Sequence, residues 1–130
     1  MDNRQIILAQ RPLGAVDDAT TTLVVSPRPE CGEGEALIKV AMLSIDSTIR
    51  TWMDDAPGYL PPIAIGDVIR GSGVGVVVES RSDYYQEGDF VFGMTGWQEW
   101  VLASTSSAQD RFILQVMRQR SAAIKKFSNM

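Results

Sequence analysis

Residues 70–81 read RGSGVGVVVESR, with three glycines at every second position followed by a valine run. Successive side chains of a β-strand point to opposite faces, so Gly71, Gly73 and Gly75 would share one face of a strand. Alternate glycines on one face predict close approach of something to that face, either another backbone or a ligand. A phosphate-binding loop would need a glycine turn that opens a helix, and the pattern G-x-G-x-x-G is not met. The stretch therefore favours close backbone packing in a β-barrel over nucleotide binding.

The neighbouring segments extend this β-rich interpretation. Strands are predicted within residues 4–12 and 21–29, where β-branched and apolar residues end at prolines. Residues 35–43, EALIKVAML, follow a Pro/Gly turn and predict a strand buried on both faces. Residues 90–104 predict two more strands, joined through Gly93 to Gly96. The fold class we expect is mainly β.

The sequence also predicts two helices, one between the strands and one after them. Residues 44–53 read SIDSTIRTWM, in which the apolar residues after Asp46 recur at helical spacing and predict a short helix, with Asp46 or Ser47 as its cap. Residues 107–110 fit a capping box that begins a basic amphipathic helix toward residue 130. Its apolar stripe would be formed by Ile113, Val116, Met117, Ile124 and Phe127. We therefore divide the chain into a β-rich body, residues 1–104, and a divergent helical segment, residues 105–130.

Composition limits what such a domain can do. The 130 residues correspond to one domain, and a net charge of -4 argues against nucleic acid as the main ligand. No apolar run is long enough to cross a bilayer and no signal peptide is evident, so we expect a cytoplasmic protein without membrane association. One cysteine and no histidine exclude a zinc site built from nitrogen and sulfur ligands. The absence of histidine also removes the usual general base near neutral pH.

Five motifs occur in an order that resembles a known family. They are NRQIILAQRPLG at 3–14, PxPxxGEGEALIKV at 27–40, LSIDSTIR at 43–50, GYLPPIAIGDVIRGSGVGVVVES at 58–80 and EGDFVFGMTGWQEW at 87–100. Together they resemble the N-terminal half of the zinc-independent medium-chain dehydrogenase/reductases, and most of all the NADPH-dependent alkenal/enone reductases, the prostaglandin reductase group. The resemblance implies a GroES-like, partly open β-barrel with short helices, followed here by the amphipathic helix.

The resemblance also implies where a small-molecule enone or alkenal would bind. In the family, the stretch that matches LSIDSTIR, residues 43–50, lies on the cleft wall and usually carries the pattern Asp-Pro-Tyr-Met-Arg or Asp-x-Tyr-x-Arg. Asp46 and Arg50 match it, whereas Ser47 and Thr48 stand at the proline and tyrosine positions. Arg70 matches a family segment at the barrel rim. The candidate substrate-binding residues are Asp46, Thr48, Arg50, Tyr59 and Arg70; no residue is assigned a catalytic, metal-binding or cofactor-binding role.

The same resemblance bears on activity. Family members use NADP(H), whose main binding site is a Rossmann domain, and we expect no such domain after residue 104. One hypothesis is therefore that the chain is the substrate-binding domain of an NADPH-dependent reductase of enone or alkenal double bonds and is inactive alone. Whether the chain is itself an enzyme stays open. The other is a non-enzymatic binding module, with the C-terminal helix covering an apolar patch or joining two protomers in a homodimer.

Overall fold

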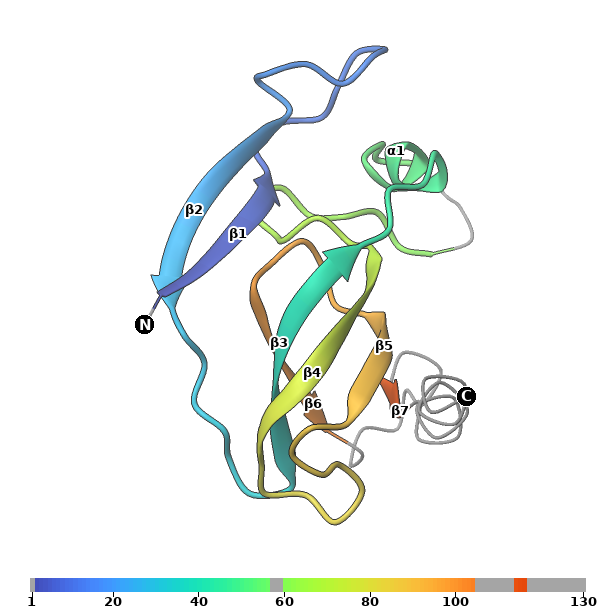
Figure 1. The fold of residues 1–130 in the computed structure, drawn as a ribbon. Helices are drawn as coiled ribbons and strands as arrows, with labels where there is room; N and C mark the ends of the chain where they lie inside the picture. Colours follow the sequence, from blue (N-terminus) through green and yellow to red (C-terminus); the bar gives the residue numbers. More distant parts are fainter. Residues whose placement is uncertain (1, 57–59, 105–113, 117–130) are drawn as a thin grey trace, which may run out of the picture.

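The computed structural model describes residues 2–56, 60–104 and 114–116. Within them the chain forms two antiparallel sheets and one short helix (Figure 1). The smaller sheet pairs β1 with β2, and the larger has the strand order β6-β3-β4-β5-β7. The elements are β1 Asp2–Leu8, β2 Thr21–Pro27, β3 Glu35–Leu43, α1 Thr48–Trp52, β4 Ser72–Ser80, β5 Phe90–Met94, β6 Trp100–Ser104 and β7 Gln115–Val116.

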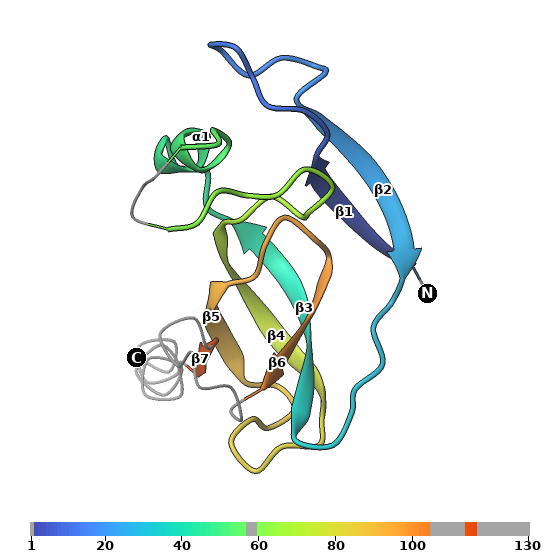
Figure 2. The same ribbon diagram turned by 180° about the vertical axis from the view of Figure 1, so that it is seen from behind.

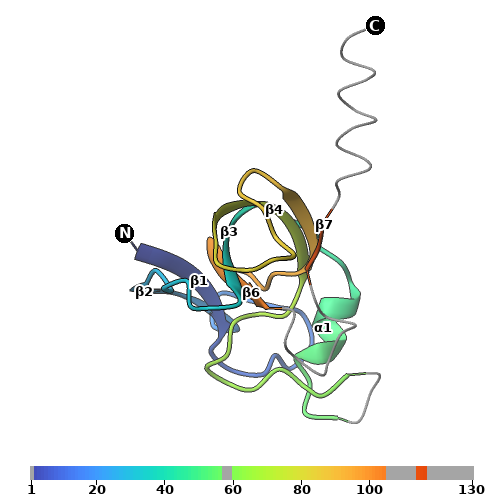
Figure 3. The same cartoon turned by 90° about the horizontal axis from the view of Figure 1, so that it is seen from below.

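The larger sheet curls into an arc when it is viewed from below (Figure 3). A sheet that curls this far without joining its two edge strands is a partly open barrel. Its interior is filled by buried apolar residues from β3, β4, β5 and β6, together with Tyr85 and Leu114. This architecture confirms the predicted fold class.

Two of the three alternate glycines lie against a backbone, as predicted, whereas Gly71 lies against the side chain of Trp97. A Cβ atom on Gly75 would lie 2.5 Å from the carbonyl oxygen of Lys39, and one on Gly73 would lie 2.6 Å from that of Met42. Both carbonyls belong to β3, which pairs with β4 along most of its length. Side chains at these two positions would force the strands apart, so the glycines allow the sheet to curl tightly.

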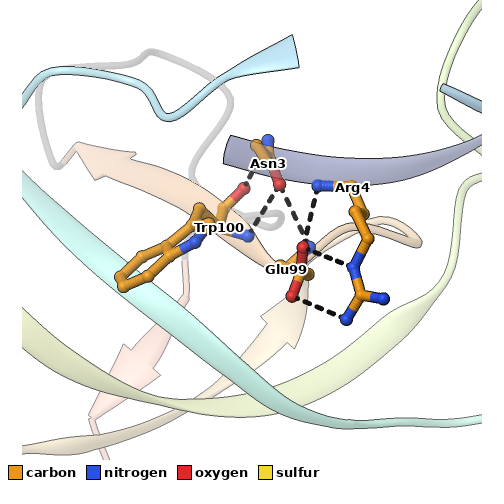
Figure 4. Close-up of polar contacts among 4 residues, drawn as sticks. All are labelled: Asn3, Arg4, Glu99 and Trp100. Carbon is orange, nitrogen blue, oxygen red and sulfur yellow. Dashed lines mark hydrogen bonds and ion pairs between the residues drawn. The ribbon is translucent and has the colours of Figure 1, made fainter. Parts of the chain in front are cut away.

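The smaller sheet is joined to the larger one through β1. The buried side chain of Asn3 accepts hydrogen bonds from the backbone N–H groups of Glu99 and Trp100, at 3.1 and 3.0 Å (Figure 4). Its amide nitrogen donates to the carbonyl oxygen of Trp100 at 3.3 Å. Beside it, the exposed guanidinium of Arg4 pairs with the carboxylate of Glu99 at 2.9 Å. These bonds hold β1 against the chain entering β6.

Strand β3 differs from its prediction in the second half. Ala36, Leu37 and Ile38 are buried, but Met42 is 68% exposed and Leu43 is exposed as well. The reason is that β6 pairs with β3 only as far as Lys39. The prediction of a strand buried on both faces was therefore wrong for the end of β3.

The predicted C-terminal helix is also corrected where the structure describes it. Gln115 and Val116 form β7, which pairs with β5, and Leu114 is buried in the core of the larger sheet. The hydroxyl of Tyr85 donates to the carbonyl oxygen of Leu114 at 2.7 Å. Val116 thus lies in a strand and not on a helical stripe, because pairing with β5 satisfies backbone groups that would otherwise lie at an open sheet edge. The other four residues of that stripe lie outside the described residues.

In the described ranges no helix has both the length and the apolar character needed to cross a membrane.

Candidate functional site

The segment after β3 forms the predicted short helix. The Asp46 carboxylate accepts a hydrogen bond from the backbone N–H of Thr48 at 2.8 Å, and this bond lowers the pKa of Asp46 below its ordinary value. Ser47 occupies the N-cap position without a side-chain capping bond. Of the two predicted caps, Asp46 is the one that binds a backbone N–H at the start of α1. Both Asp46 and Thr48 are exposed.

Arg50 is held by its own neighbourhood. Its Nη1 pairs with Asp54 Oδ1 at 2.8 Å, and its Nε donates to the carbonyl oxygen of Gly14 at 2.9 Å. A third, longer bond runs from Nη2 to the carbonyl oxygen of Pro12. The guanidinium therefore fastens α1 to the loop after β1, and its charge is already paired.

Arg70 packs against Trp52 of the same helix. Its guanidinium carbon lies 5.3 Å from the ring centroid of Trp52, a cation–π contact. Its Nη1 is buried and has no hydrogen-bond partner in the described part of the chain. Burial lowers the pKa of Arg70. Tyr59, the remaining predicted residue, lies outside the described residues.

An apolar hollow of about 350 Å³ is lined by residues from the end of β3 and the start of β4. These strand ends lie on the side of the barrel that carries α1 (Figure 2). Met42 pairs with Val74 and Val74 pairs with Phe92, so these three residues form one row across three strands. Met42 and Phe92 are 68% and 42% exposed. The lining residues are Met42, Leu43, Ser44, Ser72, Gly73, Val74, Phe92 and Gly93. Its size lies within the range of small-molecule sites, and exposed apolar surface of this kind commonly marks a binding site.

A second hollow, of about 400 Å³, lies on the other side of the end of β3. It is bounded by β1, by Leu23 of β2 and by Trp97 to Glu99, and it shares Met42 and Leu43 with the first. The Arg4–Glu99 ion pair borders it. The first hollow is the better candidate, because its residues Leu43 and Ser44 belong to the predicted cleft segment 43–50 and Ser72 follows shortly after Arg70.

Leu43 and Ser44 belong to the predicted cleft segment, but no substrate-binding role was predicted for the other residues that line this hollow. None of the described candidates, Asp46, Thr48, Arg50 and Arg70, lines either hollow. Met42 and Phe92 were assigned to strands and given no role. The available signal was the apolar run that continues to Leu43, directly before the polar segment 44–53.

The described residues do not fit a dinucleotide pyrophosphate or a metal ion. The space beside Gly73 and Gly75 is filled by the backbone of β3, and α1 has only five residues. A pyrophosphate site of the dinucleotide-binding type needs a glycine turn at the start of a longer helix. Nor do three or more acidic or cysteine side chains of the described residues gather into a metal site.

Comparison with known proteins places this geometry in context. A family profile described as the N-terminal domain of oxidoreductase matches residues 4–111. The NADPH-dependent curcumin reductase of Escherichia coli (strain K12) is 41% identical over 102 residues, which is 78% of this chain and 30% of that protein. The 2-alkenal reductase (NADP(+)-dependent) of Nicotiana tabacum is 35% identical over 108 residues, 77% of this chain and 30% of that protein.

Solved structures agree with these matches. CurA from Vibrio vulnificus has a TM-score of 0.79 at 33% identity, over 88% of this chain and 32% of that one. Its complex with NADPH has a TM-score of 0.78 at 32% identity, over 87% of this chain and 32% of that one. The chain thus spans about a third of the length of the relatives it matches. The profile match runs past residue 104, where we had expected the resemblance to end.

Proposed function

Because the chain belongs to the medium-chain dehydrogenase/reductase family, as an oxidoreductase N-terminal domain, we propose that it forms the substrate-side domain of an NADPH-dependent reductase. The proposed substrates are small molecules with an enone or alkenal double bond. The observation that carries the proposal is the open hollow at the end of β3, which is apolar and has no charged residue among its described lining residues. Conjugated carbonyl compounds are themselves largely apolar and uncharged.

The chain's own part in this reaction is to bind and orient the substrate. Met42, Val74 and Phe92 would cover one face of the conjugated system and keep water from it. NADPH, when bound, supplies the hydride, and the described residues do not fit its pyrophosphate. The domain therefore depends on a dinucleotide-binding unit for reduction, and the 130-residue polypeptide by itself should not oxidise NADPH.

Two further statements belong to this proposal. This domain would bring no zinc site of nitrogen and sulfur ligands to the reaction, since the sequence has no histidine and one cysteine. We place the protein in the cytoplasm, in agreement with the absence of a membrane-crossing helix from the described residues.

A chimaera tests the proposal. Residues 1–104 would replace the matching segment of the E. coli curcumin reductase, and NADPH oxidation would be followed with 4-phenylbut-3-en-2-one. We expect turnover that depends on this enone. The substitution Phe92→Asp should lower kcat/KM roughly tenfold or more, because a buried phenylalanine contact contributes about 1.5–3 kcal/mol.

Phe90→Asp is the matched control. Phe90 lies on the same strand and is similarly exposed, but it does not line the hollow. Its substitution should leave kcat/KM nearly unchanged. A folded chimaera that binds NADPH and yet reduces no enone would refute the proposal, as would equal effects of the two substitutions.

A further inference from the structure

Two serines mark one end of the apolar hollow. Among the described residues that line it, only Ser44 and Ser72 have side chains that donate hydrogen bonds. The backbone N–H of Ser44 donates to the carbonyl oxygen of Ser72 at 2.9 Å, which holds the two residues side by side. Both are exposed, and neither hydroxyl bonds another described residue. Two free hydroxyl donors thus stand together at the edge of an apolar surface.

The charged groups near this hollow are already used elsewhere. The Asp46 carboxylate binds the N–H of Thr48, and the Arg50 guanidinium pairs with Asp54. Within the part of the chain that the structure describes, no arginine or lysine lines the hollow. A carboxylate ligand would lose hydration on entering without gaining a cation, and that loss is unfavourable. A neutral carbonyl oxygen loses less hydration and can accept from hydroxyl donors.

We infer that Ser44 and Ser72 together bind the carbonyl oxygen of a neutral unsaturated ketone or aldehyde, while its apolar remainder lies along Met42, Val74 and Phe92. This inference rests on the proposed function and adds two substrate-binding residues and a charge preference to it. The site then selects uncharged carbonyl compounds over unsaturated carboxylic acids of the same skeleton.

The test compares two ligands on the full 130-residue chain by ¹H–¹⁵N NMR titration. The ligands are 4-phenylbut-3-en-2-one, a neutral ketone, and cinnamate, which carries a carboxylate in place of the acetyl group. The ketone should shift the backbone signals of residues 42–44, 72–74 and 92–93. Cinnamate should bind at least roughly tenfold more weakly, because its charge has no partner in the hollow.

Serine substitutions form the second arm of the test. Ser44→Ala and Ser72→Ala should each weaken ketone binding roughly two- to tenfold, the range expected for one neutral hydrogen bond. Ser47→Ala is the control, because Ser47 is exposed, makes no side-chain capping bond and does not line the hollow. The Ser47→Ala variant should bind the ketone with the same affinity as the wild-type protein.

The outcomes separate the inference from the proposed function. If the ketone binds the hollow but cinnamate binds equally well, or if neither serine substitution changes the affinity, the inference is wrong and the proposed function stands. If the ketone shifts no signal of the hollow in the wild-type chain, the proposed function itself fails. The comparison of ligands uses the unaltered protein, so it decides the matter even if a variant does not fold.

Discussion

The bond network of Asn3 gives the sharpest prediction about what holds the two sheets together. The Asn3 side chain is 3% exposed and makes two bonds to the backbone of Trp100, one to its N–H and one to its carbonyl oxygen. Replacing Asn3 with alanine removes both bonds and leaves the N–H and carbonyl groups of Trp100 buried without these partners. Each unsatisfied buried group costs about 1–3 kcal/mol, so Asn3→Ala should lower the free energy of unfolding by about 2–4 kcal/mol after some relaxation.

Urea unfolding followed by far-UV circular dichroism measures this effect. With a slope of about 2 kcal/mol per molar urea, the middle of the usual range for small proteins, the midpoint should fall by roughly 1–2 M. Arg4→Ala is the neighbouring control, since its ion pair with Glu99 is largely exposed and such pairs contribute little. An Asn3→Ala midpoint equal to that of the wild type would refute the reasoning. So would an Arg4→Ala variant that is destabilised as much as Asn3→Ala.

Two other predictions concern the barrel. Gly75→Ala should lower the free energy of unfolding in urea by about 1–3 kcal/mol or more, since the new methyl group would lie 2.5 Å from the Lys39 carbonyl oxygen. Val78→Thr is the control, because Val78 is exposed on the same strand, and it should change the stability by less than about 0.5 kcal/mol. Equal effects of the two substitutions would contradict the packing of β4 on β3. Burial, with a smaller effect of Tyr84, raises the pKa of Tyr85 to about 12. The Tyr85 hydroxyl should therefore contribute its full stabilisation below pH 10 and lose it between pH 10 and 12, because over this range the unfolded chain loses the hydroxyl proton before the folded chain does. Urea unfolding from pH 9 to 12 should show a smaller alkaline decline for Tyr85→Phe, and an unchanged decline would contradict the buried position of this hydroxyl.

The features that could be predicted from the sequence are those that local spacing determines. The glycines at 71, 73 and 75 indicated a close backbone neighbour, and Met42 and Lys39 supply it for Gly73 and Gly75. The helical spacing of Ile49 and Met53 gave α1 correctly, since both side chains are buried beneath it. In each case the side-chain period of one segment was sufficient, and no knowledge of distant contacts was needed.

The features that were missed depend on distant partners. The exposure of Met42 follows from the length of β6, which does not reach the end of β3. Val116 fitted a helical stripe in sequence, but pairing with β5 and the burial of Leu114 place this stretch in an extended strand. The hollow was missed for the same reason, because its row of Met42, Val74 and Phe92 is assembled from three strands. Periodicity alone cannot show which strand ends remain uncovered.

The position of a bound enone on this chain is the most direct test of the substrate site. Intermolecular nuclear Overhauser effects between 4-phenylbut-3-en-2-one and the 130-residue protein would locate it. We predict contacts from the ligand to the Met42 methyl group and to the Phe92 ring. Contacts only to Leu23 and Trp97, which line the second hollow, or the absence of any contact to Met42 and Phe92 at saturation, would contradict the account.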